Sequence, residues 1–331
     1  MQDVSFSDLL RASRGVVDHF VEDGGLVLRR FTKEEMKDYI SVSLDGAGLA
    51  LRKRSTSGVE FVFRTDSDEL FVEAVLSQTS SRLFGGAIDV LLDGAFYKSL
   101  SIGEVAEGVL SETISLPRGE KTVKLVLPGL YEAILRRVAL SVGASFAPVP
   151  PKRKMLMYGD SITQGYDAVY PSRTYASQLA NTLDAEAVNK AIGGEIFLPS
   201  LATLPDGADP DLITVAYGVN DWHRGIRREE YTENARAFLV NLRKKHPKAP
   251  IFVLSPIWTG DYENKEPFPF RELPCVFNDA KEGLCDVYVI DCFDFVPHDA
   301  AYYMDLVLHP NDEGYDFYAK GVLDALARYG V

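Results

Sequence analysis

A serine and a histidine in the second half of the chain could act together as a nucleophile and a general base. Ser161 lies in the motif GDSI at 159–162, directly after an apolar run, and therefore at a strand-to-helix turn where backbone N–H groups are unpaired. A hydroxyl is a weak nucleophile, and the imidazole of His309 could accept its proton and return it to a leaving group. Considered singly, Ser161 fits a helix N-cap equally well, and His309 fits an ordinary loop position.

Three amide donors could stabilise the negative charge of a tetrahedral intermediate. They are the backbone N–H of Ser161, the backbone N–H of Gly194 and the side-chain amide of Asn220. Glycine at 194 would let the backbone approach a substrate closely. A plain turn at 193–194 and an Asx-type turn at 220–221 are the alternatives for these two sites. We expect the three donors to form an oxyanion hole.

Four motifs in the second half resemble, in their order, those of the GDSL-type SGNH hydrolases, a superfamily of esterases and lipases. The motifs are GDSI (159–162), NKAIGG (189–194), GVND (218–221) and HPND (309–312). The superfamily is named for a Ser, Gly, Asn and His, which here match Ser161, Gly194, Asn220 and His309. The resemblance covers about residues 152–331 and implies a flavodoxin-like fold and acyl transfer to Ser161, followed by hydrolysis by water without a cofactor. The spacing of Cys and His also predicts no metal site.

The acid that would orient the base departs from that family's pattern. The family places an aspartate three residues before the histidine, where this chain has Leu306, and the nearest acid is Asp305, four residues before His309. Four extended residues span about 13 Å, so Asp305 reaches the imidazole only if 305–309 is turned. We expect Asp305 to be the third member of a triad. A backbone carbonyl, as known among family 2 carbohydrate esterases, and another acid such as Asp299 are the alternatives.

Aromatic residues near these motifs are candidates for substrate contacts. Trp222 follows the GVND motif directly, and Tyr166 and Trp258 follow predicted strands. Aromatic walls suit sugar rings or a small acyl group, whereas ordinary packing is the alternative. Asp160 and Asp221 are expected to brace loops rather than to transfer protons.

The elements of the second half place these motifs at one edge of a sheet. Four apolar runs alternate with amphipathic segments, which predicts βαβ units and a three-layer α/β fold with a parallel sheet. The runs are 154–159, 211–217, 250–256 and 286–291, and the helices 174–183, 228–245, 268–282 and 311–329. Reactive groups of such sheets gather at the carboxyl ends of the strands.

In the first half of the chain, apolar and polar residues alternate with a different period. From about 45 to 147 the sequence alternates with period two between turn signals such as Asp93-Gly94, which predicts an antiparallel, jelly-roll-like β-sandwich. We therefore divide the chain into a sandwich accessory domain at 1–147, a proline-rich linker at 148–153 and a catalytic domain at 154–331. This arrangement resembles family 2 carbohydrate esterases, which remove acetyl groups from sugars.

The composition of the chain limits the kinds of partner that it could bind. The net charge of −13 makes nucleic acid and membrane surfaces poor partners, whereas a neutral sugar ester is compatible. The first residues lack the pattern of a signal peptide, no apolar run is long enough to span a membrane, and three cysteines are too few for a disulfide framework. We expect a cytoplasmic protein, and a homo-oligomer is compatible with the sequence.

These patterns predict a serine ester hydrolase that forms an acyl-enzyme and removes short acyl groups, with acetyl on carbohydrate as the expected substrate. A lysophospholipase or thioesterase would need a groove for longer acyl chains. A non-catalytic carbohydrate-binding protein is the third alternative, and the displaced aspartate is the feature in its favour.

Overall fold

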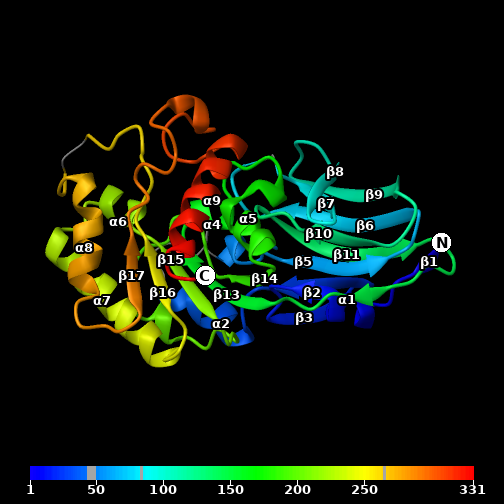
Figure 1. Cartoon of the computed structure of the whole chain (residues 1–331), viewed down its shortest axis with the longest axis horizontal. Helices are drawn as coiled ribbons and strands as arrows, with labels where there is room; N and C mark the ends of the chain where they lie inside the picture. The colour runs from blue at the N-terminus through cyan, green and yellow to red at the C-terminus, as the bar shows by residue number, and fades with distance from the viewer. Residues whose placement is uncertain (43–49, 83–84, 264–265) are drawn as a thin grey trace.

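The computed structural model describes residues 1–42, 50–82, 85–263 and 266–331. Figure 1 shows a helix-rich half and a strand-rich half side by side along the longest axis. The first residues of the predicted period-two region, 45–49, lie outside the described residues. Across the described part of the chain, no helix combines the length and the apolar character that crossing a membrane requires.

The C-terminal half is built on a five-stranded parallel sheet in the order β14-β13-β15-β16-β17. In sequence order this is 2-1-3-4-5, the flavodoxin-like arrangement, with its switch point between β13 and β15. The strands are β13 (Arg153–Gly159), β14 (Ala185–Asn189), β15 (Leu212–Ala216), β16 (Ile251–Leu254) and β17 (Val287–Ile290). The predicted α/β fold is confirmed, although the edge strand β14 was not predicted.

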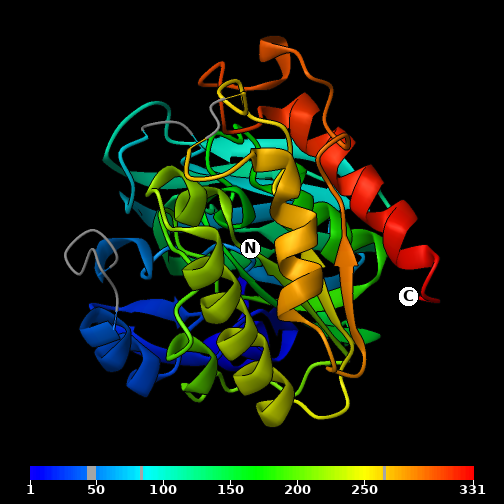
Figure 2. The same cartoon turned by 90° about the vertical axis from the view of Figure 1, so that its left-hand side faces the viewer.

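Helices cover both faces of this sheet, and Figure 2 views it from the side of α7 and α8. Leu156 and Tyr158 of β13 share a core with residues of α7 and α8, whereas Met155 and Met157 pack with α5 and α9 on the other face. The helices are α4 (Ser161–Gln164), α5 (Tyr175–Thr182), α6 (Val219–His223), α7 (Arg228–Lys245), α8 (Leu273–Ala280) and α9 (Asp312–Ala327). Single 3-10 turns are η1 (Pro171–Arg173), η2 (Leu201–Thr203), η3 (Phe270–Glu272) and η4 (Ala300–Tyr302).

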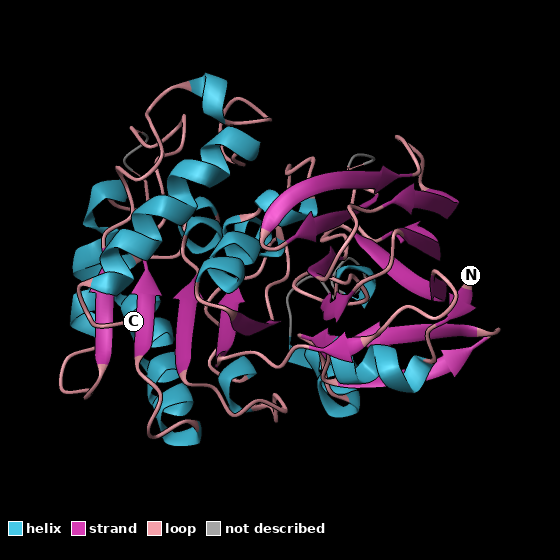
Figure 3. Cartoon of the chain, turned by 45° about the vertical axis from the view of Figure 1, so that its right-hand side comes forward, coloured by secondary structure: helices cyan, strands magenta, loops and turns pink. Residues whose placement is uncertain are grey.

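The N-terminal half consists of two antiparallel sheets that face each other across an apolar core, as predicted (Figure 3). One sheet contains β1 (Gln2–Asp3), β3 (Asp18–Glu22), β4 (Gly25–Arg29), β6 (Glu69–Gln78), β9 (Glu107–Ser115) and β11 (Tyr131–Leu140). The other contains β2 (Ser13–Arg14), β5 (Glu60–Thr65), β7 (Ala87–Leu92), β8 (Ala95–Ser101), β10 (Lys121–Val126) and β12 (Ala147–Pro148). Asp93 and Gly94 both have positive φ, as a two-residue hairpin turn between β7 and β8 requires.

The described part of the N-terminal half also contains the helices α1 (Phe6–Ala12) and α2 (Lys33–Val42), which lie outside its sheets. The start of α2 is fixed by a reciprocal capping box. The Glu35 backbone N–H donates to Thr32 Oγ1 at 3.0 Å, and the Thr32 N–H donates to Glu35 Oε2 at 2.7 Å.

The segment between the two halves, residues 148–153, is short, and strand contacts hold it at both ends. Pro148 pairs with β5, the Val149 N–H donates to the Val62 carbonyl at 3.0 Å, and β13 begins at Arg153. Few residues of the proline-rich segment are therefore free to act as a hinge.

Candidate active site

Ser161 is the first residue of α4 and follows β13 after a single residue, Asp160. Asp160 caps this helix, because its Oδ1 accepts the Ile162 N–H at 3.1 Å. Gly159 is required at the end of the strand, since a Cβ there would lie 2.2 Å from Thr163 Oγ1. Tyr315 of α9 donates its hydroxyl to the carbonyls of Ile162 and Tyr166. The turn that carries Ser161 is thus held from both sides.

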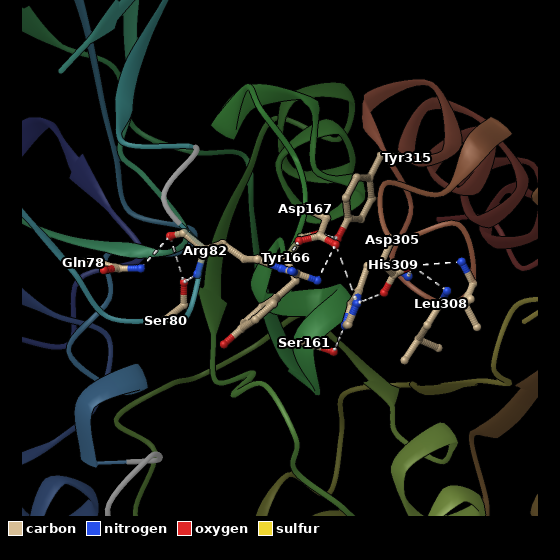
Figure 4. A network of polar contacts seen from close by, with 11 residues as sticks. Gln78, Ser80, Arg82, Ser161, Tyr166, Asp167, Asp305, Leu308, His309 and Tyr315 are labelled. Carbon is tan, nitrogen blue, oxygen red and sulfur yellow. Dashed lines mark hydrogen bonds and ion pairs between the residues drawn. The ribbon is translucent and has the colours of Figure 1, made fainter. Parts of the chain in front are cut away.

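His309 connects Ser161 to Asp305. The distance from His309 Nε2 to Ser161 Oγ is 2.8 Å, and the distance from Nδ1 to Asp305 Oδ2 is 2.7 Å (Figure 4). Because a carboxylate only accepts hydrogen bonds, the proton of the neutral imidazole belongs on Nδ1. This tautomer leaves Nε2 free to accept the hydroxyl proton of Ser161.

Asp305 reaches His309 because residues 305–309 are tightly turned. Asp305 Oδ1 accepts the backbone N–H groups of Val307, Leu308 and His309 at 3.1, 2.8 and 3.0 Å. Leu306 adopts a φ of 65°, which folds the chain back on itself. Burial raises the pKa of Asp305, but the hydrogen bonds from His309 and the three amides outweigh burial and hold the pKa well below its usual value. Asp305 can therefore hold the imidazole of His309 although it lies four residues, rather than three, before it in sequence.

The alternative acid, Asp299, lies elsewhere in this region. Its Oδ1 accepts the Ala301 N–H at 2.9 Å and caps η4. Of the two candidate acids, the structure brings Asp305 to the imidazole.

Asn220, one of the three predicted oxyanion donors, connects the segments that carry the other two, Ser161 and Gly194. Asn220, in α6 directly after β15, donates its amide to the Glu195 carbonyl at 3.0 Å and lies 3.4 Å from Asp160 Oδ2. Its amide thus bridges the neighbours of Gly194 and Ser161. Gly194 has a φ of 86°, which favours glycine. Among the described residues, the N–H groups of Ser161 and Gly194 donate to no protein atom, so both are available to an incoming oxyanion.

The N-terminal half holds the loop that carries Gly194. Arg30, fully buried after β4, donates from Nη1 to the carbonyls of Asn189 and Ala191, both at 2.6 Å. Arg52 donates to the Gly193 carbonyl at 2.6 Å. These arginines, on segments far from the motifs in sequence, fix the backbone on which an oxyanion donor depends.

Gln164 of α4 connects the same loop to the nucleophile turn. Its Oε1 accepts the Gly193 N–H at 2.7 Å, and its Nε2 donates to Ser55 Oγ at 3.0 Å. Its own carbonyl accepts the hydroxyl of Ser57 at 2.7 Å. Both strand-end loops are therefore tied to one segment of the sandwich.

Two buried carboxylates lie beneath the site. Burial raises the pKa of both Asp160 and Asp221 to about 7. Asp221 Oδ1 accepts the Phe197 N–H at 3.1 Å, as the Asp160 carboxylate accepts that of Ile162. Both therefore brace loops through backbone amides, which agrees with the expectation from sequence.

The predicted substrate contacts need correction. Trp222 is 1% exposed and donates its indole N–H to the Phe268 carbonyl, so it is a core residue rather than a pocket wall. Tyr166 is also buried, and its ring stacks on that of His309 at 5.5 Å. Trp258 is half-buried and packs on His298 and Tyr303. The expectation is wrong for Trp222, because nearness in sequence to a motif does not fix the direction of a side chain.

Two charged residues near His309 were not predicted. Asp167 is fully buried and places its Oδ2 3.8 Å from His309 Nδ1, and Arg82 of the sandwich pairs with it. No local sequence signal connects Arg82 to the site. Asp167, Asp305 and His309 form the one group of potential metal ligands in the described ranges, and their facing atoms are held by one another and by Arg82.

Residues 157–317 match the GDSL-like Lipase/Acylhydrolase family. A curated arylesterase from Vibrio mimicus is 33% identical over 88 residues, which span 24% of this chain and 44% of that protein. The chain therefore matches less than half of the length of this relative.

Several solved structures resemble nearly the whole chain. The salicylyl-acyltransferase SsfX3 from a tetracycline biosynthetic pathway is 25% identical, with a TM-score of 0.78 over 96% of this chain and 94% of that one. The acetyl xylan esterase Est2A from the rumen bacterium Butyrivibrio proteoclasticus is 18% identical, with a TM-score of 0.65 over 99% and 98% of the two chains. The motifs and the sheet order agree with the family match, and residues 157–317 carry a domain of the GDSL-like lipase/acylhydrolase family.

Proposed function

We propose that this protein is a serine ester hydrolase that works through an acyl-enzyme on Ser161. The observation that carries the proposal is the hydrogen-bonded chain from Ser161 Oγ through His309 to Asp305, with links of 2.8 and 2.7 Å. A nucleophile, a base and an acid that orients the base are the parts that acyl transfer to a hydroxyl requires.

In the first step Ser161 Oγ attacks the ester carbonyl while His309 Nε2 takes the hydroxyl proton. Asp305 holds the Nδ1–H, fixes the tautomer and stabilises the imidazolium that forms. The carbonyl oxygen becomes an oxyanion facing the N–H groups of Ser161 and Gly194 and the amide of Asn220. Collapse of the intermediate breaks the bond to the alcohol, which leaves with the proton that His309 returns.

In the second step water replaces the alcohol. His309 takes a proton from the water, whose oxygen attacks the acyl carbonyl on Ser161. The tetrahedral intermediate then releases the carboxylic acid, and Ser161 recovers its proton from His309. The residues of this chain supply every proton transfer in the cycle.

For the substrate we propose a short acyl ester of a carbohydrate, with acetyl as the acyl group. The two-part fold similar to that of an acetyl xylan esterase supports this proposal, as does a net charge of −13, which suits a neutral substrate. A second candidate is transfer of the acyl group to an alcohol, favoured by the full-length similarity to a salicylyl-acyltransferase at 25% identity. The two differ only in what attacks the acyl-enzyme.

The test is turnover of 4-nitrophenyl acetate and of acetylated oligosaccharides by the purified protein. We expect Ser161→Ala to abolish turnover and Ser115→Ala, which alters an exposed serine on β9, to leave it unchanged. Equal turnover by the wild type and Ser161→Ala would overturn the proposal. Sugar binding without turnover by the wild type would establish a binding protein instead.

A chain-length series of 4-nitrophenyl esters from C2 to C12 tests the acyl group. A preference for chains longer than about C6 would contradict the acetyl assignment and favour a lysophospholipase or thioesterase, because such chains need an extended apolar contact surface. Adding an alcohol acceptor and measuring ester formation separates hydrolysis from acyl transfer.

A further inference from the structure

A second carboxylate faces the same nitrogen of His309 as Asp305 does. Asp167 lies three residues after α4, is fully buried, and has its Oδ2 3.8 Å from His309 Nδ1. Asp305 Oδ2 lies 2.7 Å from that nitrogen and takes its proton. At the longer distance Asp167 acts on the imidazole through its charge rather than through a hydrogen bond.

Arg82 of the sandwich holds Asp167 in this position. Arg82 Nε lies 2.8 Å from Asp167 Oδ1, and Nη2 donates to Oδ2 at 3.2 Å. The turn that carries Arg82 is itself fixed, because Gln78 donates to the Arg82 carbonyl at 2.9 Å and the Arg82 N–H donates to Ser80 Oγ at 3.1 Å (Figure 4). Arg82 of the sandwich half therefore holds Asp167 through two contacts, beside the proposed base His309.

The charges around His309 come from four segments. Asp305 lies in its own turn, Asp167 follows α4, Asp160 precedes Ser161, and Arg82 reaches in from the sandwich. The ring of Tyr166 covers one face of the imidazole, and Arg52 interacts with the Tyr166 hydroxyl. Burial raises the pKa of Asp167, and the positive charges of His309 and Arg82 oppose that rise. The paired arginine favours the ionised carboxylate.

We propose that Asp167, anchored by Arg82, is a positioning residue that stabilises His309 in its protonated form while Ser161 is being acylated. Through this ion pair the sandwich half sets part of the charge balance at the base. The inference rests on the proposed function, in which His309 alternates between neutral and protonated states. No bond to Asp167 forms or breaks.

The variant Asp167→Asn tests the proposal through the pH dependence of kcat/KM for 4-nitrophenyl acetate. Asp167 has a φ of 68°, a conformation that asparagine adopts readily, so the backbone is not strained. Removing the negative charge disfavours the protonated imidazole and leaves Arg82 uncompensated beside it. We expect the acid limb of the profile to move to lower pH by about one unit and kcat to fall by about 10-fold.

Two further variants distinguish the loss of the Asp167 charge from a purely structural effect of the substitution. In Arg82→Gln/Asp167→Asn the uncompensated cation is gone, so the acid limb should move less than in Asp167→Asn alone. Asp89→Asn is the matched control: Asp89 is buried in the sandwich and accepts the N–H and hydroxyl of Ser172 at 2.9 and 2.7 Å, yet has no contact with His309 among the described residues. We expect this control to leave the acid limb unmoved.

An unmoved acid limb in Asp167→Asn, or an equal shift in Asp89→Asn, would overturn the proposal and make Asp167 a purely structural residue. The protonation of His309 can also be followed without turnover, from its ring C–H resonance in NMR, assigned by its loss in His309→Ala. If the wild type hydrolyses no ester, the proposed function fails while this titration still decides the inference. A titration of His309 that is identical in the wild type and Asp167→Asn would overturn it.

Discussion

The two halves of the molecule contribute to the site in different ways. The α/β half supplies the groups proposed to react, with Ser161 and Asn220 at the carboxyl ends of β13 and β15 on either side of the switch point. The sandwich half supplies supports: Arg30 holds the carbonyls before Gly194, and Arg82 holds Asp167 beside His309. An accessory domain in sequence can thus be an integral part of a site in structure.

Glu60 in the sandwich and two acids beside the site, Asp160 and Asp221, are buried in different electrostatic surroundings. In the sandwich, burial raises the pKa of Glu60, but Lys124 at 3.2 Å and Arg14 at 3.6 Å balance its charge. In the α/β half, Asp160 and Asp221 are capped by backbone amides, and burial raises the pKa of each to about 7. Cations therefore balance the charge of Glu60, whereas the Asp160 and Asp221 carboxylates beside the site are costly to ionise.

The largest effect is expected inside the α/β half, from Asp305→Asn. This change removes the acceptor that fixes the His309 tautomer, so we expect kcat for 4-nitrophenyl acetate to fall by about 10³- to 10⁴-fold. Asp299→Asn, at the acid that caps η4, is the matched control and should change kcat little. A loss below about 10-fold in Asp305→Asn would remove Asp305 from the triad.

The variant Arg30→Met tests whether the sandwich half supports the proposed active site or only the fold. The change removes five hydrogen bonds of a fully buried guanidinium, two of them to the carbonyls before Gly194, and we expect the free energy of unfolding in urea to fall by about 3 kcal/mol. Because the Gly194 loop loses its support, kcat should fall by about 10-fold. Arg137→Met, which alters an exposed ion pair with Asp3, should cost less than about 1 kcal/mol and leave kcat unchanged. A loss of stability in Arg30→Met with full kcat would show that the two halves are functionally separate.

Asp221→Asn tests the contrast in buried acids and should have the smallest effect. Between pH 4 and about 7 the unfolded chain has lost the Asp221 proton while the folded chain retains it, so wild-type stability falls as pH rises. We expect the variant to lose less stability between pH 5 and pH 8, and to gain about 2 kcal/mol relative to the wild type at the higher pH. The measurement is urea unfolding at both pH values.

The exposed Asp324, paired with Lys320, offers a control for that experiment, because Asp324→Asn should show no such pH-dependent gain. An Asp221→Asn variant that is destabilised equally at pH 5 and pH 8 would mean that the native carboxylate is ionised throughout.

The sequence predicted the parallel sheet because its buried strands are continuous apolar runs. It did not predict β14 (Ala185–Asn189), where Glu186 interrupts a short edge strand. Ser161 and His309 could be named in advance because they lie in motifs that resemble those of the SGNH hydrolases, and Asp305 because it is the nearest acid before His309 in sequence.

Other parts of the site could not be predicted from local sequence. Trp222 lies two residues after Asn220 on α6, and two residues on a helix rotate a side chain by about 200°, which turns Trp222 into the core. Arg30 and Arg82 act across more than 80 residues of chain, and only the packing of the two halves brings them to the site.

The central claim is that the Ser161 hydroxyl is activated by His309. Reaction with a fluorophosphonate probe, followed by peptide mass mapping, tests it directly, because the probe modifies only an activated nucleophile. We predict a single label on Ser161 in the wild type, much slower labelling in His309→Ala and none in Ser161→Ala. Labelling of a different residue, or labelling of Ser161 at an unchanged rate in His309→Ala, would contradict the account.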